Sequence, residues 1–199
     1  MNSFLDYLKE CSDCYYIYNR DFSIYGLPSK ERYTVIVKDD WICPEEYSDY
    51  DKDVFEIYTL TAFFDFVLKG KLIGWECSCL NKKYVIKEHV KLMMVTDPIQ
   101  LRRDVDAFRK AILRTESLQT TDSMYELTRM IYFSIQIIQN HKIVNYKEGK
   151  EDYSVLENSE TFDEMWHITN NIYEILKSLT DGIIKQNVLK KANKCKNTE

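Results

Sequence analysis

The sequence predicts an α+β protein in which a small mixed β-sheet with an N-terminal helix is followed by a C-terminal helical bundle. Short segments rich in aromatic and β-branched residues fall in the first half, whereas apolar residues recur at helical spacing through most of the second half. Only five glycines and three prolines occur in 199 residues, which argues against a loop-rich all-β scaffold. Because no repeat or linker is visible, we expect an α/β region at 1–96 and a helical region at 97–199, docked as one compact body.

The first half opens with apolar residues at helical spacing, which predict a short helix over 4–11. Thr59 can cap a helix that ends at Leu68, and the pattern over 72–80 is compatible with either helix or strand. Strands are expected at 15–18, 32–38, 53–58 and 84–87.

The second half contains three clear helical patterns. Asp97 followed by proline predicts the start of the first, and the second spans about 122–140. The third begins at a capping box formed by Thr161 and Glu164. Its apolar pattern weakens after Thr180, so we expect the C-terminal end to fray.

Composition limits the classes of function. The formal net charge of −5 disfavours passive adsorption to nucleic acid. The N-terminus lacks the pattern of a secretory signal, and no apolar run approaches the roughly 20 residues of a membrane helix. We therefore expect a cytoplasmic protein without a membrane partner, and its six cysteines are interpreted as reduced structural thiols.

The most informative stretch is 19–37, where a strand pattern passes through a turn into a second strand pattern. Tyr25-Gly26 lies in the turn, and Lys30-Glu31-Arg32-Tyr33 opens the second strand. This stretch resembles the first active-site motif of DNA-polymerase-β-type nucleotidyltransferases, which show Gly-Ser, then Tyr-Gly, then Ser-Asp-x-Asp. Here Asp21-Phe22 stands in place of Gly-Ser, and the segment 30–33 stands in place of Ser-Asp-x-Asp.

The segment 53–70 is also similar to that family, whose third catalytic strand carries an acidic residue followed by Tyr-x-Leu-x-x-Phe and Leu-x-x-x-Lys-Gly. Nucleotidyl transfer uses two divalent metals held by three carboxylates, two of them at i and i+2 on one strand. The resemblance implies Glu31 and Tyr33 at that pair, with Glu56 or Asp53 as the third position. Tyrosine cannot replace a bridging carboxylate at neutral pH. Asp21 would place a negative charge where the resemblance expects the triphosphate.

An alternative metal site is suggested by Asp49, Asp51 and Asp53, which alternate in the sequence. If this segment is extended, the three carboxylates share one face and could bind Mg²⁺ or Mn²⁺ near Glu56. The competing interpretation is a solvated acidic loop, because further carboxylates extend the same run.

Basic residues form the candidate nucleotide or nucleic-acid site. Arg103, Lys110 and Arg114 fall on one face of the first C-terminal helix, where they could contact phosphates or simply face solvent. The resemblance adds Tyr25, Gly26 and Lys30 of the turn to this candidate binding set.

Three hypotheses follow. The chain is either a catalytically inactive nucleotidyltransferase-like protein that binds a nucleotide, RNA or a host protein, or an active enzyme with an atypical carboxylate site. The third is an interaction protein unrelated to that family. The first is favoured because the triphosphate turn and the metal pair are both altered. It implies no cofactor, whereas activity would need Mg²⁺ or Mn²⁺.

Overall fold

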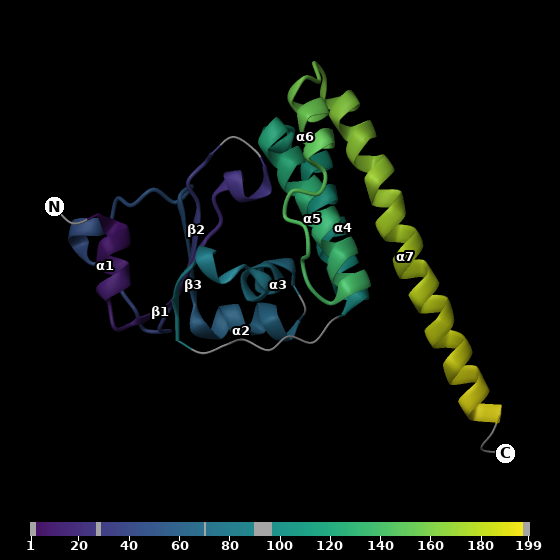
Figure 1. Ribbon diagram of the computed structural model, residues 1–199, viewed down its shortest axis with the longest axis horizontal. Helices are drawn as coiled ribbons and strands as arrows, with labels where there is room; N and C mark the ends of the chain where they lie inside the picture. Colours follow the sequence, from purple (N-terminus) through teal and green to yellow (C-terminus); the bar gives the residue numbers. More distant parts are fainter. Residues whose placement is uncertain (1–2, 27–28, 70, 90–96, 197–199) are drawn as a thin grey trace. The chain divides into compact units, whose positions relative to one another are not determined.

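The computed structural model describes residues 3–26, 29–69, 71–89 and 97–196 (Figure 1). It confirms the expected class: an N-terminal helix and a small mixed sheet come first, and helices follow. The described residues group into two units, one from 1–96 and 142–150 and the other from 97–141 and 151–199. The short segment 142–150 therefore belongs to the sheet-containing unit, although it follows two long helices of the other unit.

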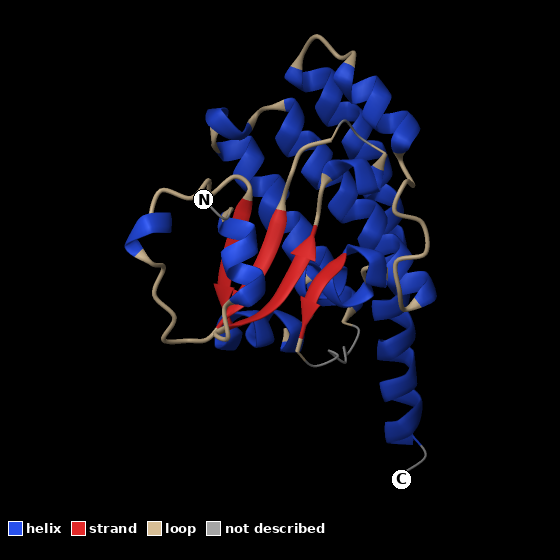
Figure 2. Ribbon diagram, turned by 60° about the vertical axis from the view of Figure 1, so that its left-hand side comes forward, coloured by secondary structure: helices blue, strands red, loops and turns tan. Residues whose placement is uncertain are grey.

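The sheet has four strands in the order β3-β2-β1-β4. They are coloured red in Figure 2. The central strand β1 pairs antiparallel with β2 and with β4, while β3 runs parallel to β2. Their bounds are β1 Cys14–Asn19, β2 Tyr33–Val37, β3 Phe55–Thr59 and β4 Val85–Glu88. All four lie close to the predicted positions.

The two faces of the sheet carry different cores. Helix α1 (Phe4–Glu10) covers one face, where Leu8 packs against Ile17 and Val35. Helices α2 (Leu60–Leu68) and α3 (Leu72–Cys79) belong to the other core. Side chains alternate along β2, so residues 33, 35 and 37 face α1 and residue 36 faces the α2–α3 side.

Local sequence explains where the helices of this unit begin. The Thr59 hydroxyl accepts the Ala62 amide at 3.3 Å and starts α2 as predicted. The undecided segment 72–80 forms α3, in which Gly74 allows a close approach to α2. A Cβ at position 74 would lie 3.1 Å from Val67 Cα.

The second unit contains long helices whose starts match the sequence prediction. Asp97 accepts amides at the start of α4, and Thr161 and Glu164 form the reciprocal capping box before α7. The bounds are α4 Pro98–Arg114, α5 Thr121–Asn140, α6 Lys150–Glu157 and α7 Phe162–Lys196. Helix α7 continues to Lys196, beyond the point at which its apolar pattern weakens, and α6 was not predicted. In the described part of the chain, no helix has both the length and the apolarity needed to cross a membrane.

Candidate functional site

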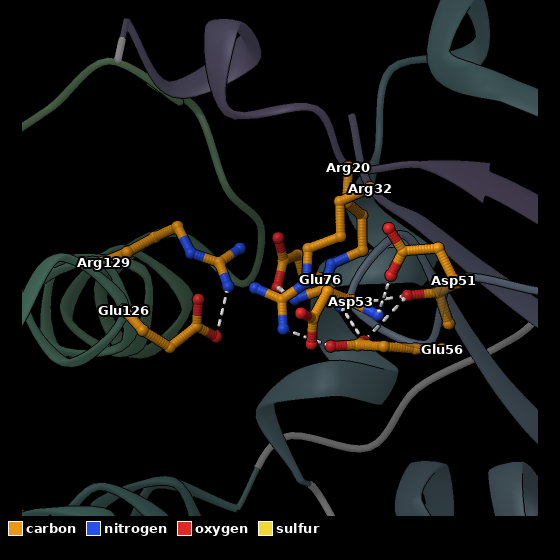
Figure 3. Close-up of polar contacts among 9 residues, drawn as sticks. Arg20, Arg32, Asp51, Asp53, Glu56, Glu76, Glu126 and Arg129 are labelled. Carbon is orange, nitrogen blue, oxygen red and sulfur yellow. Dashed lines mark hydrogen bonds and ion pairs between the residues drawn. The ribbon is translucent and has the colours of Figure 1, made fainter. Parts of the chain in front are cut away.

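The most unusual feature of the sheet unit is a buried cluster of charged side chains on the α2–α3 face, shown in Figure 3. Thr34 on β2 lies beside Glu56 on β3 in the parallel register. Arg20 directly follows β1 and donates from Nη1 to Thr34 Oγ1 at 2.9 Å and to Glu56 Oε2 at 2.6 Å. Its Nη2 donates to Glu76 Oε2 of α3 at 3.1 Å. The cluster therefore joins three strands to α3.

Both oxygens of Glu56 accept hydrogen bonds from arginines. Arg20 binds Oε2, and Arg32 binds Oε1. The side chains of Arg20 and Glu76 are 3% and 1% exposed, whereas those of Arg32 and Glu56 are 23% and 20% exposed. Each guanidinium group thus lies against a carboxylate, which is the pairing that buried charges require.

The predicted pairing of Glu31 and Tyr33 with Glu56 is wrong. Tyr33 points to the α1 face of the sheet, and its hydroxyl donates to Glu31 Oε1 at 2.7 Å. Burial and this hydrogen bond raise the pKa of Tyr33 to about 12. The i and i+2 residues that share a face with Glu56 are instead Arg32 and Thr34, because a shift of one residue along a strand reverses the face.

The second predicted metal site also lacks its expected geometry. Asp49, Asp51 and Asp53 are exposed, and the segment turns instead of running extended. The Asp51 carboxylate caps this turn by accepting the Asp53 amide at 2.8 Å. In Figure 3 the side chains of Asp51 and Asp53 point toward the cluster around Arg32. Among the residues that the structure describes, no group of three or more His, Cys, Asp or Glu could hold a metal ion.

The turn between β1 and β2 is stabilised from within. Asp21 accepts the Ser23 amide at 2.7 Å and the Ser29 hydroxyl at 2.8 Å. Partial burial raises the pKa of Asp21, but these hydrogen bonds outweigh it and leave the pKa below its ordinary value. Gly26 closes the short helix 22–25 with φ of 81°, a left-handed conformation that suits glycine. Asp21, whose negative charge was predicted at this turn, is therefore the N-cap of the short helix 22–25.

The predicted binding residues of this turn are only partly placed. Lys30 is exposed, with its Nζ 5.7 Å from the centroid of the Phe22 ring. The side chain of Tyr25 lies outside the described residues. Their role in binding a nucleotide stays a prediction.

The basic residues of α4 divide between two roles. Arg103, Lys110 and Arg114 are exposed, as expected for one solvent-facing side of the helix. Arg102 and Arg109 instead contact α7: Arg102 binds Asp181, and the Arg109 guanidinium lies 3.6 Å from the centroid of the Tyr173 ring. Binding of nucleic acid by the exposed three stays a prediction.

The five cysteines that the structure describes are free thiols, as expected for reduced cysteines. Burial raises the pKa of Cys14 to about 11 and also raises the pKa of Cys77. Neither thiol has the low pKa of a reactive cysteine.

Sequence reasoning missed Arg20 and Glu76, the two most buried members of the cluster. The signal for Glu76 was a single carboxylate within the apolar segment Leu72-Ile-Gly-Trp-Glu-Cys. Such a residue needs a buried partner, but the sequence does not identify a partner 56 positions away. Comparisons with protein-family models, curated proteins and solved structures found no match to this chain.

Proposed function

We propose that this chain is a nucleotidyltransferase-like protein that has lost nucleotidyl transfer and acts by binding. The observation that supports the proposal is the capture of both Glu56 oxygens by Arg20 and Arg32. In the family that the sequence resembles, the corresponding carboxylate is a metal ligand.

The strand pairing shows which residues share a face with Glu56. The parallel strands β2 and β3 bring positions 32, 34 and 56 to one face of the sheet. Two-metal transfer needs carboxylates at three such positions. Here they hold arginine, threonine and glutamate.

The charges do not fit a divalent cation. An arginine stays protonated throughout the physiological pH range, so its guanidinium repels a metal ion at the same carboxylate. Each oxygen of Glu56 is already paired with a guanidinium group, so this carboxylate offers a metal ion less negative charge than an unpaired carboxylate would. The residues at positions 32, 34 and 56 therefore do not suit the metal pair.

The first experiment measures transfer of labelled nucleoside triphosphates to RNA or protein in the presence of Mg²⁺ or Mn²⁺. We expect no product from the full chain. Metal-dependent transfer that Glu56→Ala abolishes would overturn the proposal and favour the active enzyme.

A gain-of-binding experiment tests the three positions directly. The variant Arg32→Asp/Thr34→Asp restores three carboxylates on one face, and we expect Mn²⁺ to raise its melting temperature. The matched control Arg32→Asn/Thr34→Asn has no added carboxylates and, like the unaltered chain, should not respond. A Mn²⁺ response of the unaltered chain that Glu56→Gln removes would contradict the assignment.

Three further measurements distinguish a nucleotide, RNA and a host protein as the ligand. A nucleotide should raise the melting temperature, RNA should give a gel shift that weakens with salt, and a host protein should be recovered by pull-down. For RNA, Arg103→Gln/Lys110→Gln tests the exposed side of α4. If none of these ligands binds, the binding role fails even if transfer is absent.

A further inference from the structure

A cavity of about 380 Å³ lies within the sheet unit, lined by residues from the end of α3, from 81–84 and from 143–147. This volume is in the range of small-molecule sites. Ile24 and Ile143, which are 4% and 5% exposed, give it an apolar wall. Neither the buried arginines nor the glutamates of the charged cluster line it. The cavity is therefore a separate candidate site.

The charge of the cavity is positive. Lys83 and Lys147 line it, and none of the described residues that line it carries a carboxylate. This is notable in a chain whose net charge is −5. Since a hollow lined by one sign of charge concentrates ions of the opposite sign, the cavity favours an anion.

Two asparagines position the segments that carry these lysines. Asn81 Oδ1 accepts the Lys83 amide at 3.2 Å, and Asn145 Oδ1 accepts the Lys147 amide at 3.0 Å. Each lysine thus follows, by two residues, an asparagine that closes a turn at the cavity wall. The same local device therefore holds the backbone of both lysines.

Aromatic side chains complete the wall. Tyr146 donates its hydroxyl hydrogen to the carbonyl oxygen of Cys79, which ties 143–147 to the end of α3. Tyr84 is half-buried, and Lys83 Nζ lies 4.6 Å from the centroid of its ring. Aromatic side chains beside an apolar wall suit a flat ring better than a bare ion.

We propose that this cavity binds a small phosphate monoester whose phosphate is attached to a flat ring. Lys83 and Lys147 contact the phosphate oxygens, while Tyr84 and the two isoleucines contact the ring. The proposal does not rest on the lost transfer activity, because it uses none of the residues at positions 32, 34 and 56.

Phenyl phosphate is the probe, titrated into the full chain by isothermal calorimetry at low salt. We expect Lys83→Met and Lys147→Met each to weaken binding at least tenfold. The matched control is Lys82→Met, which removes an equally charged, exposed neighbour that does not line the cavity, and it should change Kd less than twofold. Phenol and inorganic phosphate should each bind at least tenfold more weakly than phenyl phosphate.

Because both lysines are exposed, their variants should keep the melting temperature of the unaltered chain, so that lost binding is not lost folding. The site is refuted if phenyl phosphate shows no binding at millimolar concentration. It is also refuted if Lys82→Met weakens binding as much as Lys83→Met. Equal binding of inorganic phosphate would remove the ring from the proposal.

Discussion

Removal of Arg20 should destabilise the sheet unit more than removal of any other charged side chain of the cluster. Arg20 is 3% exposed and donates to Thr34, Glu56 and Glu76. Removing one partner of a buried ion pair costs roughly 3–5 kcal/mol, because the remaining charge stays in a poorly solvated position. We therefore expect Arg20→Met to lower the free energy of unfolding by about that amount.

Arg32→Met provides the comparison. Its side chain is 23% exposed, and Glu56 is 20% exposed, so water can replace part of the lost interaction. We expect a loss of about 1–2 kcal/mol, the range for a charge-assisted hydrogen bond that is partly solvated. The difference between the two losses thus compares a buried arginine that binds two carboxylates with a partly exposed arginine that shares one of them.

The assay is urea unfolding followed by tryptophan fluorescence. Trp166→Phe serves as the background, because Trp41 and Trp75 then report on the sheet unit alone. The double variant Arg20→Met/Glu76→Gln completes a thermodynamic cycle. Since it also removes the stranded charge, its loss should be smaller than the sum of the single losses by at least about 1 kcal/mol. A loss below 1 kcal/mol for Arg20→Met, or an additive cycle, would refute the reasoning.

Three further predictions concern the surroundings of the sites. Burial and the carboxylate that accepts its hydroxyl hydrogen raise the pKa of Tyr33 to about 12. Tyr33 therefore stabilises the fold below pH 10, and this stability is lost as the pH rises toward 12. In urea unfolding at pH 9–12, Tyr33→Phe should reduce that alkaline loss of stability. Lys87 donates to the backbone carbonyls of Lys9 and Cys11 at the end of α1, at 3.1 Å and 2.7 Å. Lys87→Met should therefore lower the free energy of unfolding by about 1–2 kcal/mol and speed hydrogen exchange in α1. The exposed control Lys38→Met should lower it by under about 0.5 kcal/mol. Arg109 stacks on aromatic rings of α7, so Arg109→Lys should lower the free energy of unfolding by about 1 kcal/mol in calorimetric melting; an equal effect of Arg103→Lys on the exposed side would contradict this.

The sequence predicted the elements whose signals are local. Thr59, Asp97 and the Thr161–Glu164 box cap helices where expected, because a capping side chain acts within three residues of its own position. The face that each residue of β2 occupies was harder to predict. Every residue of that strand is buried, so no alternation of polar and apolar residues distinguished residues 33 and 35 from residues 34 and 36.

The prediction of the candidate site depended on knowing which residues of β2 share a face with Glu56. Glu31 and Tyr33 fitted the motif spacing, yet Arg32 and Thr34 are the residues beside Glu56. The sequence also could not identify the partner of Glu76, because the packing of α3 on the sheet determines its hydrogen bond to Arg20. Helix α6 was not predicted, because only Tyr153 and Leu156 mark its buried side.

The assignment of residues 142–150 to the sheet unit has a consequence for synthesis of the chain. A ribosome completes β4 long before it reaches Tyr146, which donates to the carbonyl of Cys79. The sheet unit must therefore wait, with one part of its cavity wall missing, while α4 and α5 are made. A fragment that ends at residue 96 would lack this segment permanently. The hydrogen bond from Tyr146 to Cys79 can thus form only after α4 and α5 of the other unit have been translated.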